Sequence, residues 1–186
     1  MERQGRPPKV KDRWYHDERY RQARNFTPRK LKIAPQFTLD DLYVSPFNYK
    51  RRHDEDGRQT YVAVAPDRQP TGIRVLDELL CTMTDGNSDI AAFCRRCGAR
   101  LADLDGLLFL LTGQRGIEFR QAYQLRLADD LLRYTPLTIP QVARRGGFGS
   151  RVNLYYAYQR DLRTNPTDRR ELLRQPGDED RYRMDL

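Results

Sequence analysis

The sequence has no long apolar run and few cysteines, and these absences exclude several classes of protein. No stretch approaches the roughly 18 apolar residues that a membrane-spanning helix needs. The opening residues, MERQGRPPKVKDR, lack the apolar centre of a secretory signal. Cys81, Cys94 and Cys97 cannot all pair and are too sparse for a disulfide framework, which fits a reducing compartment. We therefore expect a cytoplasmic protein with no membrane contact.

Groupings of metal-binding or catalytic residues are also missing. The spacing Cys94-x-x-Cys97 suits zinc, but a structural zinc site needs four ligands, and only Cys81, His16 and His53 remain, without paired spacing. Helical periodicity turns both sulfurs of the pair toward the core. There is no phosphate-binding glycine loop, and neither histidine has a catalytic partner at a recognisable spacing. The sequence predicts no metal, no cofactor and no enzymatic activity.

Positive charge is present in excess and is unevenly spread. The 186 residues include 34 Lys plus Arg and 26 Asp plus Glu, a formal net charge of +8. Residues 1–60 carry a net +6, and residues 61–186 carry only +2. This balance points toward polyanionic partners, although a surface of mixed charges is also simply well solvated.

Residues 1–70 are interpreted as a basic, mostly extended N-terminal arm. Residues 1–35 interleave basic and aromatic side chains without a helical or alternating pattern. The apolar runs 42–44 and 61–64, separated by the charged turn 51–57, predict a short hairpin. The arm's candidates for phosphate or partner contacts are Arg13, Arg19, Arg21 and Arg24. RNA binding, docking on an acidic protein surface and a purely solubilising role remain alternatives.

Residues 72–174 have the apolar periodicity of an all-α fold with about seven helices. Apolar side chains recur at three- and four-residue steps near 75–83, 90–97, 101–111, 119–132, 138–145, 150–162 and 168–173. Thr138 and Gln141 form a capping-box pattern, and Gly98 and Gly147 are typical of helix ends. Residues 175–186 are expected to be a disordered tail.

Two segments of this helical region repeat one pattern. Ile90, Phe93, Cys94, Arg95, Arg96 and Gly98 correspond at constant spacing to Ile139, Val142, Ala143, Arg144, Arg145 and Gly147. Each unit consists of a short helix, a glycine-containing turn and a longer helix. This is the arrangement of a helix-turn-helix, whose second helix can enter the DNA major groove.

The second unit carries a family resemblance. Its residues are Ala128-Asp129-Asp130-Leu131-Leu132, Thr135, Leu137-Thr138-Ile139, Val142-Ala143, Gly147-Phe148-Gly149-Ser150, Leu154, Tyr158, Leu162 and Pro166. This pattern resembles the C-terminal DNA-binding domain of the AraC/XylS family over residues 76–172. The resemblance implies two helix-turn-helix units, joined by a linking helix, that read successive major-groove segments. Residues 1–70 are too few for the family's usual ligand-binding domain.

The sequence departs from the family pattern at several positions. Arg163 stands where the family usually has a glycine, and Gln159 stands where a basic residue is common. Tyr158 replaces a phenylalanine, so its hydroxyl needs a hydrogen-bond partner. In the first unit, Cys94 replaces a small alanine, and Arg100 occupies a position where a capping serine or threonine is common.

The second unit supplies the candidate DNA-reading face. Its predicted contacts are Arg144, Arg145, Ser150, Arg151, Val152, Asn153, Tyr155, Tyr156 and Gln159. Arginine can pair with guanine, and asparagine or glutamine with adenine. The alternative is an ordinary polar helix surface, with Arg144 and Arg145 merely favoured by the negative end of their helix.

The first unit lacks such a face. The corresponding positions hold Ala102, Asp103, Asp105 and Gly106, and residues 88–113 carry no net charge, whereas residues 139–170 carry +5. We infer that the first unit has lost most base reading. Arg95 and Arg96 remain candidates for phosphate or partner contacts, and Leu107, Phe109 and Leu110 offer apolar surface to a protein partner.

These observations support two hypotheses. The first is a bacterial, nucleoid-associated transcription regulator that binds double-stranded DNA and reads the major groove mainly with the second helix-turn-helix. The alternative is a structural or interaction subunit of a larger assembly, in which the degenerate helix-turn-helix domain is a protein-docking module and the N-terminal arm is a tether.

Overall fold

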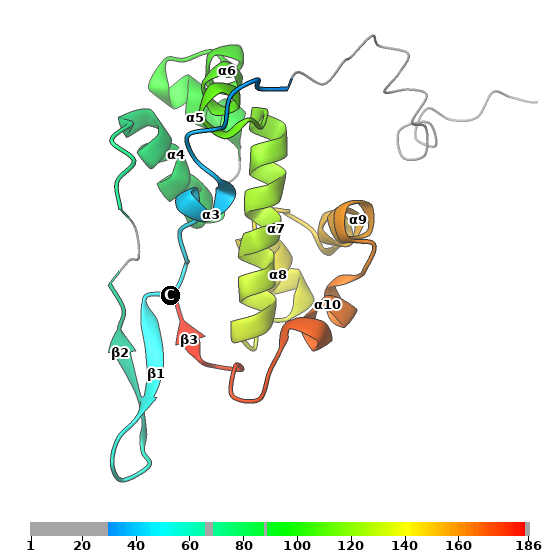
Figure 1. Cartoon of the computed structure of the whole chain (residues 1–186). Coiled ribbons are helices and arrows are strands. Elements are labelled where there is room, and N and C mark those ends of the chain that lie inside the picture. Colours follow the sequence, from blue (N-terminus) through cyan, green and yellow to red (C-terminus); the bar gives the residue numbers. More distant parts are fainter. Residues whose placement is uncertain (1–29, 66–68, 88, 185–186) are drawn as a thin grey trace, which may run out of the picture. The chain divides into compact units, whose positions relative to one another are not determined.

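The computed structural model describes residues 30–65, 69–87 and 89–184 (Figure 1). The chain divides into two units, Met1–Lys32 and Ile33–Leu186, so the division falls well before residue 70, where the composition of the sequence predicts the end of the arm. Of the first unit only residues 30–32 are described, and the arm candidates Arg13, Arg19, Arg21 and Arg24 lie outside the described residues.

Helices account for most of the described part of the second unit. Those between residues 72 and 174 are α4 (Arg74–Thr84), α5 (Ile90–Cys97), α6 (Leu101–Thr112), α7 (Gly116–Tyr134), α8 (Ile139–Arg145), α9 (Arg151–Leu162) and α10 (Pro166–Leu173). These confirm the seven helices that the apolar periodicity predicts. Helices α5 and α6 form the first unit of the repeat, α8 and α9 form the second, and α7 links them.

Side chains at the helix starts explain where these helices begin. The Asp89 carboxylate accepts a hydrogen bond from the Ala92 backbone N–H at 2.9 Å, and the Ser150 hydroxyl accepts one from the Asn153 N–H at 3.2 Å. Before α8, the Gln141 side chain accepts from the Thr138 N–H at 2.8 Å, as its capping-box pattern predicts. Each bond satisfies a backbone donor that has no partner within its helix.

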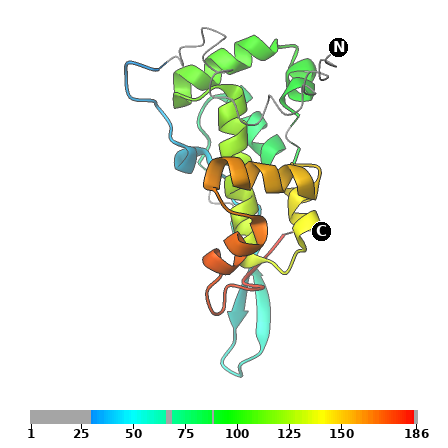
Figure 2. The same ribbon diagram turned by 90° about the vertical axis from the view of Figure 1, so that its right-hand side faces the viewer.

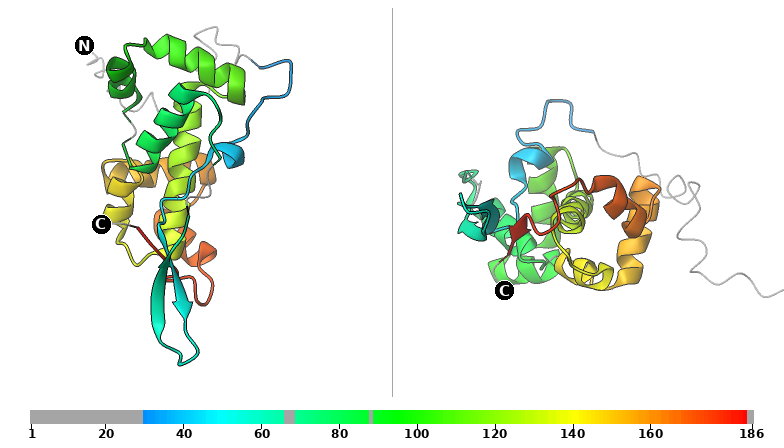
Figure 3. Two further views of the ribbon diagram at one scale, coloured as in Figure 1. Left: turned by 90° about the vertical axis from the view of Figure 1, so that its left-hand side faces the viewer. Right: turned by 90° about the horizontal axis from the view of Figure 1, so that it is seen from below.

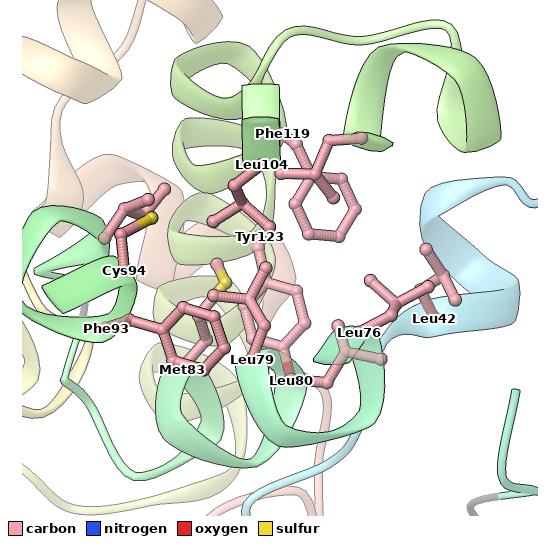
Figure 4. Packing of buried hydrophobic residues seen from close by; sticks show 12 residues of the cluster. Leu42, Leu76, Leu79, Leu80, Met83, Phe93, Cys94, Leu104, Phe119 and Tyr123 are labelled. Atoms are coloured by element: carbon pink, nitrogen blue, oxygen red, sulfur yellow. The ribbon is translucent and has the colours of Figure 1, made fainter. Parts of the chain in front are cut away.

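Helix α7 runs between two apolar cores and contributes to both. The first core packs α4, α5 and α6 around Phe119 and Tyr123 of α7, as Figure 4 shows. The second gathers α8 and α9 around Leu127 and Leu131, near the other end of the same helix. Figure 2 shows α9 lying across α7, with α8 and α10 beside it. Each unit therefore completes its own core with side chains of the shared helix α7.

The helical fold expected for residues 72–174 is confirmed, but the described chain as a whole is not all-α, because it also holds a three-stranded antiparallel sheet outside that range. Its strands are β1 (Tyr49–His53), β2 (Gln59–Ala63) and β3 (Tyr182–Arg183), in the order β2-β1-β3. The hairpin was expected, but with its first strand at 42–44. Leu42 instead ends the short helix α3 (Leu39–Leu42), which Thr38 caps. The first strand of the hairpin is β1, which carries Lys50, Arg51 and Arg52. The sequence predicted a turn over part of this segment because charged residues are more typical of turns than of strands.

The C-terminal tail departs from the sequence-based expectation as well. Residues 175–184, expected to be disordered, turn back so that β3 pairs with β1. The Tyr182 ring stacks on Phe47 with centroids 5.2 Å apart, and Asp178 is only 2% exposed. Asp178 receives a hydrogen bond from Arg133 of α7 at 2.7 Å. The acidic composition of the tail resembles disorder, but a distant arginine neutralises its buried carboxylate.

Residues 33–65 belong to the same folded unit as the helices. Leu42 and Phe47 are 1% and 6% exposed and lie in the first and second core respectively. The Tyr43 hydroxyl donates to Asp130 of α7 at 2.7 Å, and burial raises the pKa of Asp130 above its usual value. This segment therefore covers α7 and helps to hold it.

Candidate nucleic-acid interface

Helix α9 is fixed to α7 by buried side chains and one polar cluster. Leu154 and Tyr158 are fully buried, as the helical periodicity predicts, but Leu162, which was expected on the same inward face, is 38% exposed. The Tyr158 hydroxyl finds the partner it needs in Asp129, at 2.8 Å. Arg169 of α10 also donates to Asp129, from Nε to Oδ1 at 3.1 Å. Because Asp129 joins three helices, the outward face of α9 is held in a defined orientation.

The opposite face of α9 is exposed and carries most of the predicted DNA contacts. Val152, Tyr155 and Tyr156 are 55%, 47% and 51% exposed, and Arg151 is exposed beside them. Gln159 is half-buried one turn further along. Ser150 is exposed, but its hydroxyl caps the helix. An exposed helix face with a cation, large apolar rings and an amide is chemically suited to base edges and phosphates.

Asn153 is on this face but its side chain is already engaged. Its Nδ2 donates to the Phe148 carbonyl at 2.9 Å, across the turn between α8 and α9. The bond ties the start of α9 to the turn. One Nδ2 hydrogen and the side-chain oxygen remain for a base, but the bond to Phe148 already fixes the direction in which the amide points.

The arginines of the second unit are largely engaged within the protein. Arg160 pairs with Asp161, Arg169 with Asp129, and Arg170 donates to the Leu137 carbonyl. The charge of +5 counted in the sequence thus overstates what this surface offers a ligand. Within the described part of the chain, the arginines of α8, α9 and the α9 end that make no side-chain hydrogen bond or ion pair are Arg144, Arg151 and Arg163.

Arg144 and Arg145, predicted together, lie in different surroundings. Arg144 is exposed at the end of α8. Arg145 is half-buried, and its Nη1 lies 3.7 Å from the Met184 sulfur. Arg145 also lines a cavity of about 690 Å³ between α4, α7, α8 and residues 44–48. The structure therefore brings Arg144, and not Arg145, into the set of exposed cations.

Arg163 was noted in the sequence only as a departure from the family pattern, yet it completes this set. It is exposed directly after α9, with a left-handed backbone at φ 55°. Glycine is the usual residue in this conformation because a side chain crowds the backbone there. An arginine at a position where the family usually has a glycine was the sequence signal that could have marked Arg163 as a candidate.

The first unit is built differently at the corresponding positions. Asp103 makes a two-point ion pair with Arg100 and also accepts from the Arg100 backbone N–H, so Asp103 supplies the cap that residue 100 does not. Asp105 accepts from the Gly116 N–H at 2.8 Å and so caps α7. Both carboxylates thus have structural roles within the protein. The face of α6 that corresponds to the exposed face of α9 therefore carries acidic side chains in place of cations.

The two candidate cations of the first unit are both exposed, at the end of α5. Arg96 donates to the Thr82 hydroxyl at 3.0 Å and lies over the Phe93 ring. Arg95 extends into solvent beside it. The apolar side chains of this unit are partly exposed as well: Leu110 is 64% exposed on α6, and Leu107 and Phe109 are half-buried.

Cys94 is buried, as predicted, but Cys97, which was expected to face the core as well, is exposed. The described residues contain no group of three or more His, Cys, Asp or Glu side chains placed to hold a metal ion. None of the described helices is long and apolar enough to cross a membrane.

Comparisons with known proteins found little. No family model matches the sequence, and no curated protein matches it. Among solved structures, the chain is similar to the xylose-binding transcription activator xylR, at a TM-score of 0.46 and 17% sequence identity. The similarity covers 61% of this chain and 33% of that one, so the chain corresponds to about a third of the activator's length. Xylose binding is a property of that activator.

Proposed function

We propose that this protein is a sequence-specific DNA-binding regulator that places α9 in the major groove. The observation that carries the proposal is the exposed face of α9, where Arg151, Val152 and Tyr155 project from a helix whose other face is buried. A helix is the element that fits the major groove, and arginine is its commonest reader of guanine. The resemblance of residues 76–172 to the AraC/XylS DNA-binding domain supports the same function.

The three available cations divide into two roles. Arg151 is the first residue of α9, where a recognition helix contacts base edges. Arg144 and Arg163 stand at the ends of α8 and α9, and we assign them to phosphates on either side of the groove. The phosphate contacts would supply affinity that depends on salt, and Arg151 would supply sequence preference.

The direct test is selection from a randomised duplex library with the full chain, followed by sequencing of the retained DNA. A DNA-reading α9 predicts an enriched motif centred on one major-groove segment, because the first unit offers no comparable face. Retention without any enriched sequence would leave only charge-driven binding, and failure to retain DNA at low salt would reject the function altogether.

One observation favours a second function, a protein-docking subunit. Leu101, Leu110 and Ile117, on α6 and at the start of α7, are 56%, 64% and 53% exposed. The carboxylates of Asp103 and Asp105 are each paired with an arginine within the chain, so they add little net charge near these apolar side chains. A partner retained stoichiometrically at high salt, together with no enriched DNA motif, would support this function over the first.

A further inference from the structure

Strand β2 is an exposed edge of the sheet. The strand order β2-β1-β3 leaves its outer side without a neighbouring strand among the described residues. Four of its five residues are exposed, including Val62 at 41%, and Val64 just beyond it is 36% exposed. Figure 3 shows the hairpin projecting beyond the end of α7, and isolated hairpins of this kind are marginally stable in water.

The sequence of β2 does nothing to protect this edge. Its five residues, Gln-Thr-Tyr-Val-Ala, include no charge and no proline, in a chain of which 32% is charged. Natural edge strands usually carry such residues because open backbone groups recruit other strands. The charges of the hairpin lie instead on β1 and in its turn, with Lys50, Arg51 and Arg52 on the strand.

The register identifies the backbone groups that point outward. The Val64 N–H donates inward to the Asn48 carbonyl at 2.8 Å, and Val62 lies opposite Lys50 on β1. Because hydrogen-bonded and non-hydrogen-bonded pairs alternate along an antiparallel ladder, Val62 and Thr60 also bond inward. The N–H and C=O groups of Gln59, Tyr61 and Ala63 therefore face away from β1.

We infer that a second copy of this chain pairs its β2 with this edge, antiparallel and centred on Tyr61. In this register Tyr61 meets the partner's Tyr61, and Gln59 meets the partner's Ala63, each pair exchanging two backbone hydrogen bonds. Val62 lies opposite the partner's Thr60, so every cross-strand pair is neutral. The two three-stranded sheets become one continuous sheet across a twofold axis.

Nucleic acid fits this edge less well than a second copy does. Asp54, Glu55 and Asp56 form the exposed turn of the hairpin, and their carboxylates would meet phosphates if the ribbon entered a groove. The outer strand itself offers no cation. The inference does not rest on the DNA-binding function, because the hairpin and α9 are separate surfaces.

Sedimentation equilibrium of the full chain tests the inference. We expect a concentration-dependent mass between 22.0 kDa and twice that value. Ala63→Pro removes an outward-facing N–H and leaves the hydrogen bonds to β1 in place, so this variant should be monomeric. The matched control Ala63→Thr keeps the N–H and should still dimerise. A wild-type chain that is monomeric at every concentration, or an Ala63→Pro chain that dimerises as tightly as wild type, would overturn the inference.

Disulfide trapping tests the register even if Ala63→Pro disturbs the hairpin. The background for this test is Cys81→Ser, Cys97→Ser. With Thr60→Cys and Val62→Cys together, each new thiol lies opposite one of the partner's thiols, at a non-hydrogen-bonded pair, where side chains of neighbouring strands are closest. Mild oxidation should give a covalent dimer, whereas Thr60→Cys alone should give far less. Equal yields from both variants, or a dimer that appears only when duplex DNA is added, would contradict the pairing.

Discussion

The hydroxyl of Tyr158 on α9 donates a 2.8 Å hydrogen bond to Asp129 on α7, and Arg169 of α10 donates to the same carboxylate. This relationship couples the linking helix to the helix that we propose to enter the major groove. A phenylalanine could fill the same space without the bond. The orientation of α9 therefore depends on a polar contact as well as on packing.

Tyr158→Phe should lower the free energy of unfolding by about 2 kcal/mol, because the variant removes a buried bond to a charged acceptor. Urea denaturation measures the change, and the control is Tyr155→Phe, whose hydroxyl lies on the exposed face. Equal stabilities of the two variants would show that the Asp129 contact contributes nothing.

Arg163→Gly should stabilise the protein by about 0.5–1 kcal/mol, because glycine adopts the left-handed backbone of this position without steric cost. Arg163→Ala removes the same charge and keeps the strain, so it is the matched control for thermal unfolding. If Arg163 contacts phosphate, both variants should bind DNA more weakly in spite of their different stabilities.

The Asp178 carboxylate should make the fold sensitive to acid. Burial by itself raises the pKa of Asp178, but hydrogen bonds from Arg133, Gln175 and Arg181 outweigh it, and the pKa lies below its usual value. A carboxyl whose pKa is lower in the folded than in the unfolded chain stabilises the fold above the unfolded pKa, near 3.9. That contribution is lost as the pH falls through the folded pKa.

Asp178→Asn isolates this contribution. The variant should lose about 2 kcal/mol of stability at neutral pH and should show a shallower loss below about pH 4 than wild type. Denaturant titrations at a series of pH values measure both effects. Parallel stability curves for wild type and variant would refute the role assigned to Asp178.

Arg144→Ala should weaken DNA binding uniformly across sequences. If Arg144 contacts one phosphate, the slope of log K against log salt should become shallower by about 0.9. Fluorescence anisotropy over a salt series measures the slope. Arg74→Ala removes another exposed charge, from α4, and should leave the slope unchanged, so a similar effect of both variants would indicate only net charge.

The helices could be predicted from the sequence because their evidence is local. Apolar side chains at helical spacing define the buried faces of α4 to α10, and Thr138, Ser150 and Gly98 mark ends whose caps the structure confirms. Such signals lie within one or two turns, so no knowledge of the tertiary structure is required.

The sheet and the folded tail could not be predicted in this way. β1 is a charged strand, and the two-residue β3 becomes a strand only because Tyr182 reaches Phe47 and Asp178 reaches Arg133. These partners are far away in the sequence. The acidic composition of residues 175–184 suggested a disordered tail. Only the fold brings Arg133 next to Asp178, where it neutralises the buried carboxylate.

The candidate interface was predicted only in part, for a related reason. Periodicity correctly separates the exposed Tyr155 from the buried Tyr158. It cannot reveal that Asn153 is bonded to Phe148, that Arg145 turns toward Met184, or that Arg163 is left exposed. Charge counted along a sequence includes arginines that are already paired across the fold.

The base preference of Arg151→Ala tests the proposed function most directly. Selection from a randomised duplex library should show that the variant loses discrimination at one position of the wild-type motif, worth about 1–3 kcal/mol, while Arg74→Ala keeps the motif intact. If Arg151→Ala selects the same motif with the same discrimination as wild type, α9 does not read DNA through Arg151, and the proposed function of this helix is contradicted.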